Sequence, residues 1–217
     1  MSKKVAVIGA TGFVGAHVVK ELSNRGYQVE ALARDISKVP ALENVSSKSI
    51  DINNSEDLSE ALKGNDAVIN TFNPGWTNPN LYDDFLNGSI AIEKAVENSG
   101  VKRFITVGGA GSLFIDGNQL VDGPDFPADI KPGATAARDY LDVIKKNTVL
   151  DWTFFSPAIE MHQGTAGVRV GKYRTALENP VFNDDGRSVL SVEDVAVVLV
   201  DELEQNNHIR ERFTAGY

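Results

Sequence analysis

The sequence has 217 residues, 42% of them hydrophobic, and a formal net charge of -9 at pH 7. It contains no cysteine, which excludes disulfide scaffolds, thiolate metal sites and cysteine nucleophiles and suits a cytoplasmic protein. The balance of 21 Lys and Arg against 30 Asp and Glu argues against nucleic acid or a membrane surface as a partner. We therefore expect a small-molecule substrate, and any redox chemistry requires a borrowed cofactor.

Short apolar runs alternate with longer amphipathic segments, which indicates βαβ units around a buried parallel sheet. Strands are predicted at residues 5–8, 28–33, 47–50, 67–71, 103–107 and 152–156, with a short final strand at 212–214. Helices are predicted at residues 12–25, 55–63, 81–99, 134–147 and 192–204. Three of these helices end on Gly26, Gly64 or Gly100, the usual left-handed C-terminal cap, and Ser191 to Asp194 fits a capping box. The longest aliphatic stretch, Val195 to Val200, is far shorter than the roughly 20 residues of a membrane helix.

A glycine-rich turn, Gly9-Ala10-Thr11-Gly12-Phe13-Val14-Gly15, lies between the first strand and the first helix. In this position Gly9 permits a tight turn, Gly12 lets backbone N–H groups approach phosphates, and Gly15 allows helix and strand to pack closely. The alternative is an ordinary glycine-rich turn without a ligand. We predict that this turn binds a dinucleotide pyrophosphate through Gly9, Thr11, Gly12, Phe13, Val14 and Gly15.

The end of the second strand selects between NADP and NAD. An acidic side chain there binds the ribose 2′-hydroxyl of NAD, but this sequence has Ala33 followed by Arg34. A guanidinium favours a 2′-phosphate, so NADP is predicted, with NAD left open; the alternative is that Arg34 is a solvated strand-end charge. Further cofactor contacts are expected where the other strands end, at Asp51, Ile52, Thr71, Phe72, Asn73, Gly108, Gly109, Ser156 and Pro157.

These observations predict an α/β fold, a Rossmann-type doubly wound parallel sheet. Residues 1–217 are expected to form a single NAD(P)-binding domain, with a small elaboration from about residue 159 to 217 that acts as a substrate-side lid. Long loops that directly follow strands, at residues 72–80 and 108–133, are expected to carry function.

Several segments together carry a family resemblance. Besides the glycine turn they are Val107 to Leu113, Asp125 to Pro127, Trp152 to Ala158, Gly171 to Tyr173, Ser191 to Ala196 and Arg212 to Tyr217. With them, essentially the whole chain resembles the atypical short-chain dehydrogenases/reductases known as NADH-flavin reductases, within the NAD(P)H-binding group of biliverdin reductase B and the NmrA-like proteins. The resemblance implies a nicotinamide cofactor and places the substrate side near Ser112.

The catalytic Tyr-x-x-x-Lys pair of ordinary short-chain dehydrogenases is missing, because Ile144 stands four residues after Tyr140. Without that acid, reduction of an unactivated carbonyl is disfavoured. A flavin remains a suitable substrate, because it accepts hydride at N5 and can take its proton from water. Ser112 is the one candidate catalytic residue, and a loop-capping role is the alternative.

The leading hypothesis is an NAD(P)H-dependent oxidoreductase that transfers a hydride to a flavin or similar planar acceptor. The alternatives are a non-catalytic NADP(H)-sensing regulatory protein of NmrA-like type and an enzyme resembling sugar-nucleotide epimerases and dehydratases. No metal site is predicted, since the three histidines have no acidic companions at ligand spacing. The sequence leaves a homodimer open.

Overall fold

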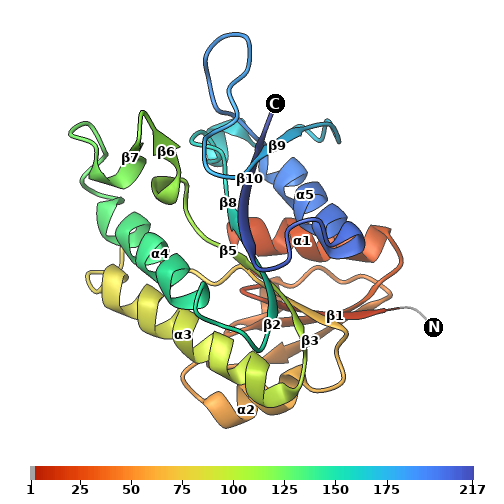
Figure 1. Cartoon of the computed structure of the whole chain (residues 1–217). Helices are drawn as coiled ribbons and strands as arrows, with labels where there is room; N and C mark the ends of the chain where they lie inside the picture. The colour runs from red at the N-terminus through yellow and green to blue at the C-terminus, as the bar shows by residue number, and fades with distance from the viewer. Residues whose placement is uncertain (1–2) are drawn as a thin grey trace.

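The computed structural model describes residues 3–217, whose main sheet carries helices on both faces (Figure 1). The eight-stranded sheet has the order β3-β2-β1-β4-β5-β8-β10-β9. Its strands are β1 (Lys4–Ile8), β2 (Gln28–Ala33), β3 (Val45–Ser49), β4 (Ala67–Asn70), β5 (Arg103–Val107), β8 (Asp151–Ser156), β9 (Arg174–Ala176) and β10 (Glu211–Gly216). Neighbouring strands pair in parallel, and β9 alone is antiparallel to its neighbour β10. This confirms the predicted Rossmann-type fold.

The helices are α1 (Phe13–Asn24), α2 (Ser55–Leu62), α3 (Leu81–Ser99), α4 (Lys131–Ile144) and α5 (Val192–Gln205). In β1 the side chains of Val5 and Val7 enter one core cluster, and those of Ala6 and Ile8 enter the other. Both faces are therefore apolar, as a buried parallel sheet requires. Helices α1 and α5 pack together on the first face, and α2, α3 and α4 pack side by side on the second (Figure 1).

The predicted helix ends are confirmed at three glycines. Gly26, Gly64 and Gly100 follow α1, α2 and α3 with φ angles of 80°, 76° and 85°, a conformation that glycine adopts without a Cβ penalty. Helix α4 begins earlier than predicted, at Lys131, because Pro132 is tolerated in a first turn where its missing N–H is not needed.

Three short strands were not predicted, namely β6, β7 and β9. Strands β6 (Phe114–Ile115) and β7 (Asn118–Gln119) form a hairpin around Asp116 and Gly117, both of which have positive φ. The Asp-Gly dipeptide is a strong signal for such a turn and could have revealed it.

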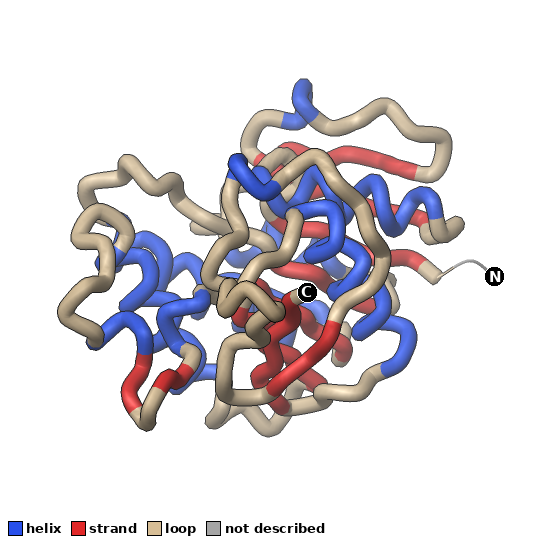
Figure 2. Tube along the Cα trace, turned by 90° about the horizontal axis from the view of Figure 1, so that it is seen from above, coloured by secondary structure: helices blue, strands red, loops and turns tan. Residues whose placement is uncertain are grey.

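Between residues 157 and 191 the chain departs from the βα alternation, although β9 in this stretch pairs with β10 at the edge of the main sheet. Helix α5 and strand β10 then resume the alternation. Seen from above, the loops of this region surround the C-terminus (Figure 2). No helix within residues 3–217 is long and apolar enough to cross a membrane.

Candidate functional site

The glycine turn packs directly against the end of β4. Gly9 has a φ of +77°, and a Cβ at Gly15 would lie 2.1 Å from the Gly9 carbonyl oxygen and 2.6 Å from Thr71 Oγ1. Thr71 Oγ1 donates to the carbonyl oxygens of Ile8 and Gly9, at 2.8 and 3.3 Å. Strands β1 and β4 are neighbours in the sheet. From β1 the chain continues to β2 and β3 on one side of β1, and it then crosses to β4 and β5 on the other side. The turn thus lies at the topological switch point, where ligands of this fold bind.

The first turn of α1 presents unblocked backbone donors. Gly12 is the N-cap residue, no side chain caps the helix, and no acidic residue occupies its first turn. A Cβ at Gly12 would meet only the Gly9 carbonyl oxygen, at 3.2 Å, so the outer side of the turn is open. Thr11, Phe13 and Val14 are each half-buried around it. An open helix N-terminus with positive partial charge suits a diphosphate, so these residues fit the predicted cofactor.

Arg34 follows β2 at the same edge of the sheet, and its side chain is exposed. No carboxylate within residues 3–217 pairs with it, and its neighbour Asp35 instead accepts from Ser37 and lies 3.8 Å from Lys38. Because the Arg34 guanidinium pairs with no carboxylate of the described residues, it can bind an anionic group of a ligand.

The loops after β3 and β4 combine polar turns with apolar side chains. Asp51 Oδ1 accepts from the backbone N–H of Asn53 at 3.0 Å, and Asn73 Oδ1 accepts from that of Gly75 at 2.8 Å. The side chains of Ile52 and Phe72 pack on Gly88 of α3, and the Phe72 ring stacks 6.3 Å from that of Phe85.

The loops after β5 and β8 are joined by their backbones and by two hydroxyl groups. Gly108 N–H donates to the Phe155 carbonyl oxygen at 2.8 Å, and a Cβ at Gly108 would overlap the Phe154 ring. Ser112 Oγ donates to the Gly109 carbonyl oxygen at 3.1 Å and lies 3.0 Å from Ser156 Oγ. Ser112, Ser156 and Pro157 are buried.

The burial of Ser112 bears on the catalytic role predicted for it. Its hydroxyl group holds two loops together and is not exposed, which favours a positioning role.

The structure brings all the predicted site residues to the carboxyl ends of the parallel strands. Their roles towards a ligand stay predictions.

Tyr140 lies within the core on α4, with its ring 6.3 Å from that of Phe154. Burial raises the pKa of the Tyr140 phenol well above its ordinary value, and the Glu93 carboxylate adds to the rise. A buried phenol with so high a pKa is a poor proton donor to a ligand at the sheet edge. This placement agrees with the missing Tyr-x-x-x-Lys pair.

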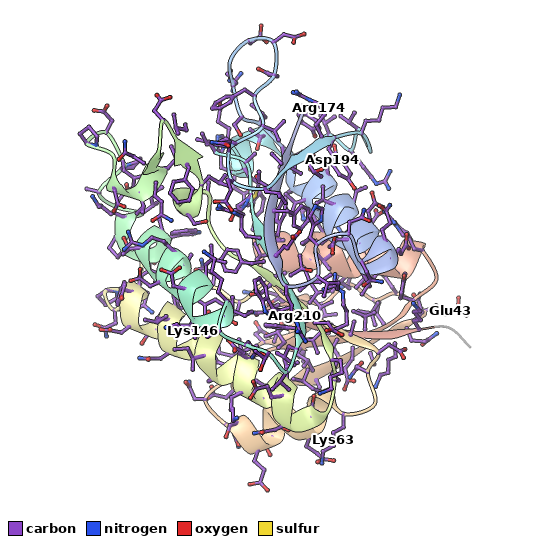
Figure 3. All side chains as sticks on the ribbon, in the orientation of Figure 1. Glu43, Lys63, Lys146, Arg174, Asp194 and Arg210 are labelled. Carbon is purple, nitrogen blue, oxygen red and sulfur yellow. The ribbon has the colours of Figure 1, made fainter. Side chains whose placement is uncertain are left out.

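Residues 167–171, within the region 159–217 that was predicted to act as a lid, are bonded to α1 and α5. The buried carboxylate of Asp194, labelled in Figure 3, accepts from the backbone N–H groups of Val170 and Gly171, both at 2.8 Å. It also accepts from Tyr217 Oη at 2.5 Å. Glu193 accepts from Gly167 N–H at 2.8 Å.

The predicted capping box is therefore only half correct. Ser191 Oγ does accept from Asp194 N–H, at 3.1 Å, but the Asp194 carboxylate does not return to Ser191 N–H. That N–H donates to Tyr217 Oη instead, at 3.3 Å. Sequence reasoning could not foresee this, because the groups that engage Asp194 come from distant segments.

Two cavities lie away from this edge. One of about 390 Å³ is lined by residues that include Tyr173, Glu202, His208 and Phe213, and one of about 400 Å³ lies near Lys102, Arg103 and Asp151, where strands β5 and β8 begin. We place the site at the glycine turn, because a phosphate ligand is recognised there by open N–H donors and not by an enclosed volume. No group of three or more potential metal-ligating side chains occurs within residues 3–217.

A family model described as NAD(P)H-binding matches residues 9–206. The chain belongs to this NAD(P)H-binding family. The uncharacterized protein YwnB of Bacillus subtilis (strain 168) is 35% identical over 214 residues, which cover 97% of either chain. The family membership supports the fold and the nicotinamide cofactor together.

Two solved structures are similar over nearly their whole length. One is titled a "putative epimerase" from Bacteroides thetaiotaomicron, with 40% identity, a TM-score of 0.91, and coverage of 100% of this chain and 98% of that one. The other is titled a "putative NADH-flavin reductase" from Streptococcus pneumoniae TIGR4, with 37% identity, a TM-score of 0.84, and coverage of 99% of each chain. These relatives support an oxidoreductase-like NAD(P)H-binding protein and carry two different names for its chemistry.

Proposed function

We propose that the protein is an NAD(P)H-dependent reductase that transfers a hydride from the nicotinamide to a flavin or similar planar acceptor. The observation that carries the proposal is the open N-terminus of α1 behind a glycine turn packed on Thr71, in a chain of the NAD(P)H-binding family. The similarity to the streptococcal protein supports the acceptor class. When bound, the reduced nicotinamide supplies the hydride.

In this proposal the cofactor phosphates are held mainly by backbone. The N–H groups around Gly12 would hold the pyrophosphate, with Gly9 and Gly15 keeping the turn close to Thr71. Asp51, Ile52, Phe72 and Asn73 would border the adenosine half, and the loops that begin at Gly108 and end β8 at Ser156 would border the nicotinamide half. Arg34 would pair with a 2′-phosphate, which favours NADPH over NADH.

The choice of a flavin as the proposed acceptor follows from the placement of Tyr140, which does not supply a general acid at the sheet edge. Tyr140 is buried, so it cannot protonate an alkoxide at the sheet edge. A flavin requires no such acid, because its reduced ring can be protonated by water. The protein then acts by holding nicotinamide and acceptor in contact, an effect of roughly 7 to 11 kcal/mol in well-oriented systems.

The test is to follow the oxidation of NADPH by its absorbance with FMN, FAD, riboflavin and quinones, each against an enzyme-free blank. Turnover above the blank with at least one acceptor, and faster with NADPH than with NADH, is expected. If none of these acceptors is reduced although NADPH binds tightly, the NADP(H)-sensing alternative replaces the reductase.

An epimerase is a second candidate, favoured by the similarity to the Bacteroides protein that is described as an epimerase. It would require an acid or base at the sheet edge, where Tyr140 does not reach. Conversion of a nucleotide sugar without net consumption of cofactor would support it. The cytoplasmic location and the homodimer stay predictions.

A further inference from the structure

A buried arginine lies beside the loop that follows β5. The side chain of Arg212, on β10, is 3% exposed. Its Nη1 donates to the Ser112 carbonyl oxygen at 2.9 Å and lies 3.4 Å from Ser112 Oγ. Its Nη2 donates to Glu178 Oε2 at 2.5 Å, and its Nε has no hydrogen-bond partner within residues 3–217. Arg212 therefore contacts the loop after β5 through both the backbone and the hydroxyl group of Ser112.

The contact between Arg212 and Ser112 is linked to β8 through Ser156. Ser112 Oγ lies 3.0 Å from Ser156 Oγ, and Thr214 of β10 pairs in register with Ser156. One guanidinium thus connects β10, the loop after β5 and the end of β8, which are the elements that border the nicotinamide half of the proposed site.

The carboxylate partner of Arg212 comes from a surface segment. Residues 177–182, here called the strap, follow β9, and the Glu178 side chain is 59% exposed. The strap also forms two hydrogen bonds with Phe114, the first residue of β6. The Phe114 N–H donates to the Glu178 carbonyl oxygen at 2.9 Å, and Asn179 Nδ2 donates to the Phe114 carbonyl oxygen at 2.8 Å. The guanidinium carbon of Arg212 lies 5.9 Å from the centre of the Phe114 ring.

The two ends of this ion pair differ in exposure. Arg212 lies in the sheet, whereas Glu178 belongs to a segment whose Leu177 and Phe182 side chains are 48% and 41% exposed. Burial lowers the pKa of the Arg212 guanidinium, and the Glu178 carboxylate opposes that change. A buried cation without its partner is costly, so the pair keeps the strap against Phe114 and the loop after β5.

We propose that Arg212 is a positioning residue for the acceptor side of the site, and that Glu178 clamps the strap onto it. The pair fixes the loop from Gly108 to Phe114, and with it the surface on which the acceptor lies. This inference rests on the proposed reductase function. It assigns the pair mainly to acceptor affinity, because the fixed loop borders only the nicotinamide end of NADPH and the phosphates are proposed to bind at the glycine turn.

The test is Glu178→Gln, which removes the charge and keeps the size of the side chain. Its matched control is Glu160→Gln, because Glu160 also pairs with an arginine of the same region, Arg187, and makes no bond to the loop after β5. We expect KM for the acceptor to rise about tenfold in Glu178→Gln, the equivalent of one charge-assisted hydrogen bond, with kcat changed less than about twofold. The dissociation constant of NADPH should change less than about twofold in Glu178→Gln, since only the nicotinamide end borders the loop, and Glu160→Gln should keep both the wild-type dissociation constant and the wild-type KM.

Amide hydrogen exchange gives a readout that does not depend on activity. In Glu178→Gln the Phe114 amide should exchange at least about tenfold faster, while the Asn183 amide, which donates to the Arg187 carbonyl oxygen, should keep its rate. Arg212→Lys, which keeps the charge but loses the planar fork, should change KM and Phe114 exchange in the same direction.

If Glu178→Gln leaves both the acceptor KM and the exchange of the Phe114 amide unchanged, the proposed clamp is wrong. It is also wrong if the substitution only lowers the denaturant concentration at which the protein unfolds. If the wild-type protein reduces no acceptor, the proposed function fails, and the exchange of Phe114 still decides whether Glu178 holds the strap.

Discussion

The two halves of the proposed site are built from different parts of the chain. The cofactor half is made of backbone from short, local segments, with Gly9, Gly12 and Gly15 within one turn and Thr71 packed behind them. The acceptor half is held by side chains that come from far apart, with Ser112, Ser156, Glu178 and Arg212 meeting across 100 residues of sequence. Backbone recognition leaves a pattern that sequence reasoning can find, whereas long-range side-chain contacts leave none.

The largest expected effect is that of Gly15→Ala on the cofactor half. The new Cβ would lie 2.1 Å from the Gly9 carbonyl oxygen, a backbone atom that cannot move without opening the turn. We expect a loss of about 3 kcal/mol in the free energy of unfolding, at the upper end of the usual overpacking cost, measured by urea denaturation.

The matched variant is Gly12→Ala, whose Cβ would lie 3.2 Å from the same oxygen. It should stay folded with a loss of less than about 1 kcal/mol, but bind NADPH more weakly because the methyl group stands where the phosphates approach. Equal destabilisation by both substitutions would show that the turn is not packed as described.

Arg34→Ala tests the predicted choice of cofactor. Removing the guanidinium should weaken NADPH binding by about 1 to 3 kcal/mol and leave NADH binding unchanged, as calorimetric titration would measure. Lys38→Ala is the control, since Lys38 is an exposed cation close by that already lies 3.8 Å from Asp35. Equal losses for the two cofactors would place the 2′-phosphate elsewhere.

Ser112→Ala separates a positioning role from a catalytic one. Because the hydroxyl is buried between Gly109 and Ser156, its loss should cost about 1 kcal/mol of stability and raise the acceptor KM. A fall of kcat by about a hundredfold with an unchanged KM would instead assign proton transfer to Ser112.

The smallest effect concerns the attachment of the C-terminal region to α1. Burial tends to raise the pKa of the Glu21 carboxyl, but hydrogen bonds from Arg169 and Arg25 outweigh it, and the pKa is lowered from 4.5. A lowered pKa stabilises the folded state above pH 4.5, and this contribution is lost as the pH falls through the folded-state value. In Glu21→Gln the free energy of unfolding should therefore fall less steeply below pH 4.5 than in the wild type, as denaturant unfolding at several pH values would show. The same steepness in both proteins would contradict this assignment.

The sequence alone was sufficient for the parallel α/β fold class, the glycine turn and the three helix ends at glycines, because periodicity and glycine conformations are local properties. It could not reveal that Asp194 binds the backbone of Val170 and Gly171, or that Arg212 pairs with Glu178. These partners are 24, 23 and 34 residues away, so the contacts depend on how the chain returns to the sheet. The hairpin at Asp116 and Gly117 is different, because its Asp-Gly turn signal is local and is present in the sequence.

The most direct test of the contrast between the two halves is a crystal structure of the protein with NADP bound. We predict that the pyrophosphate lies on the backbone N–H groups around Gly12, that the 2′-phosphate contacts Arg34, and that the nicotinamide lies beside the loop that begins at Gly108. A dinucleotide found in the cavity near Tyr173 and His208, or a nicotinamide turned away from the ends of β5 and β8, would contradict the account.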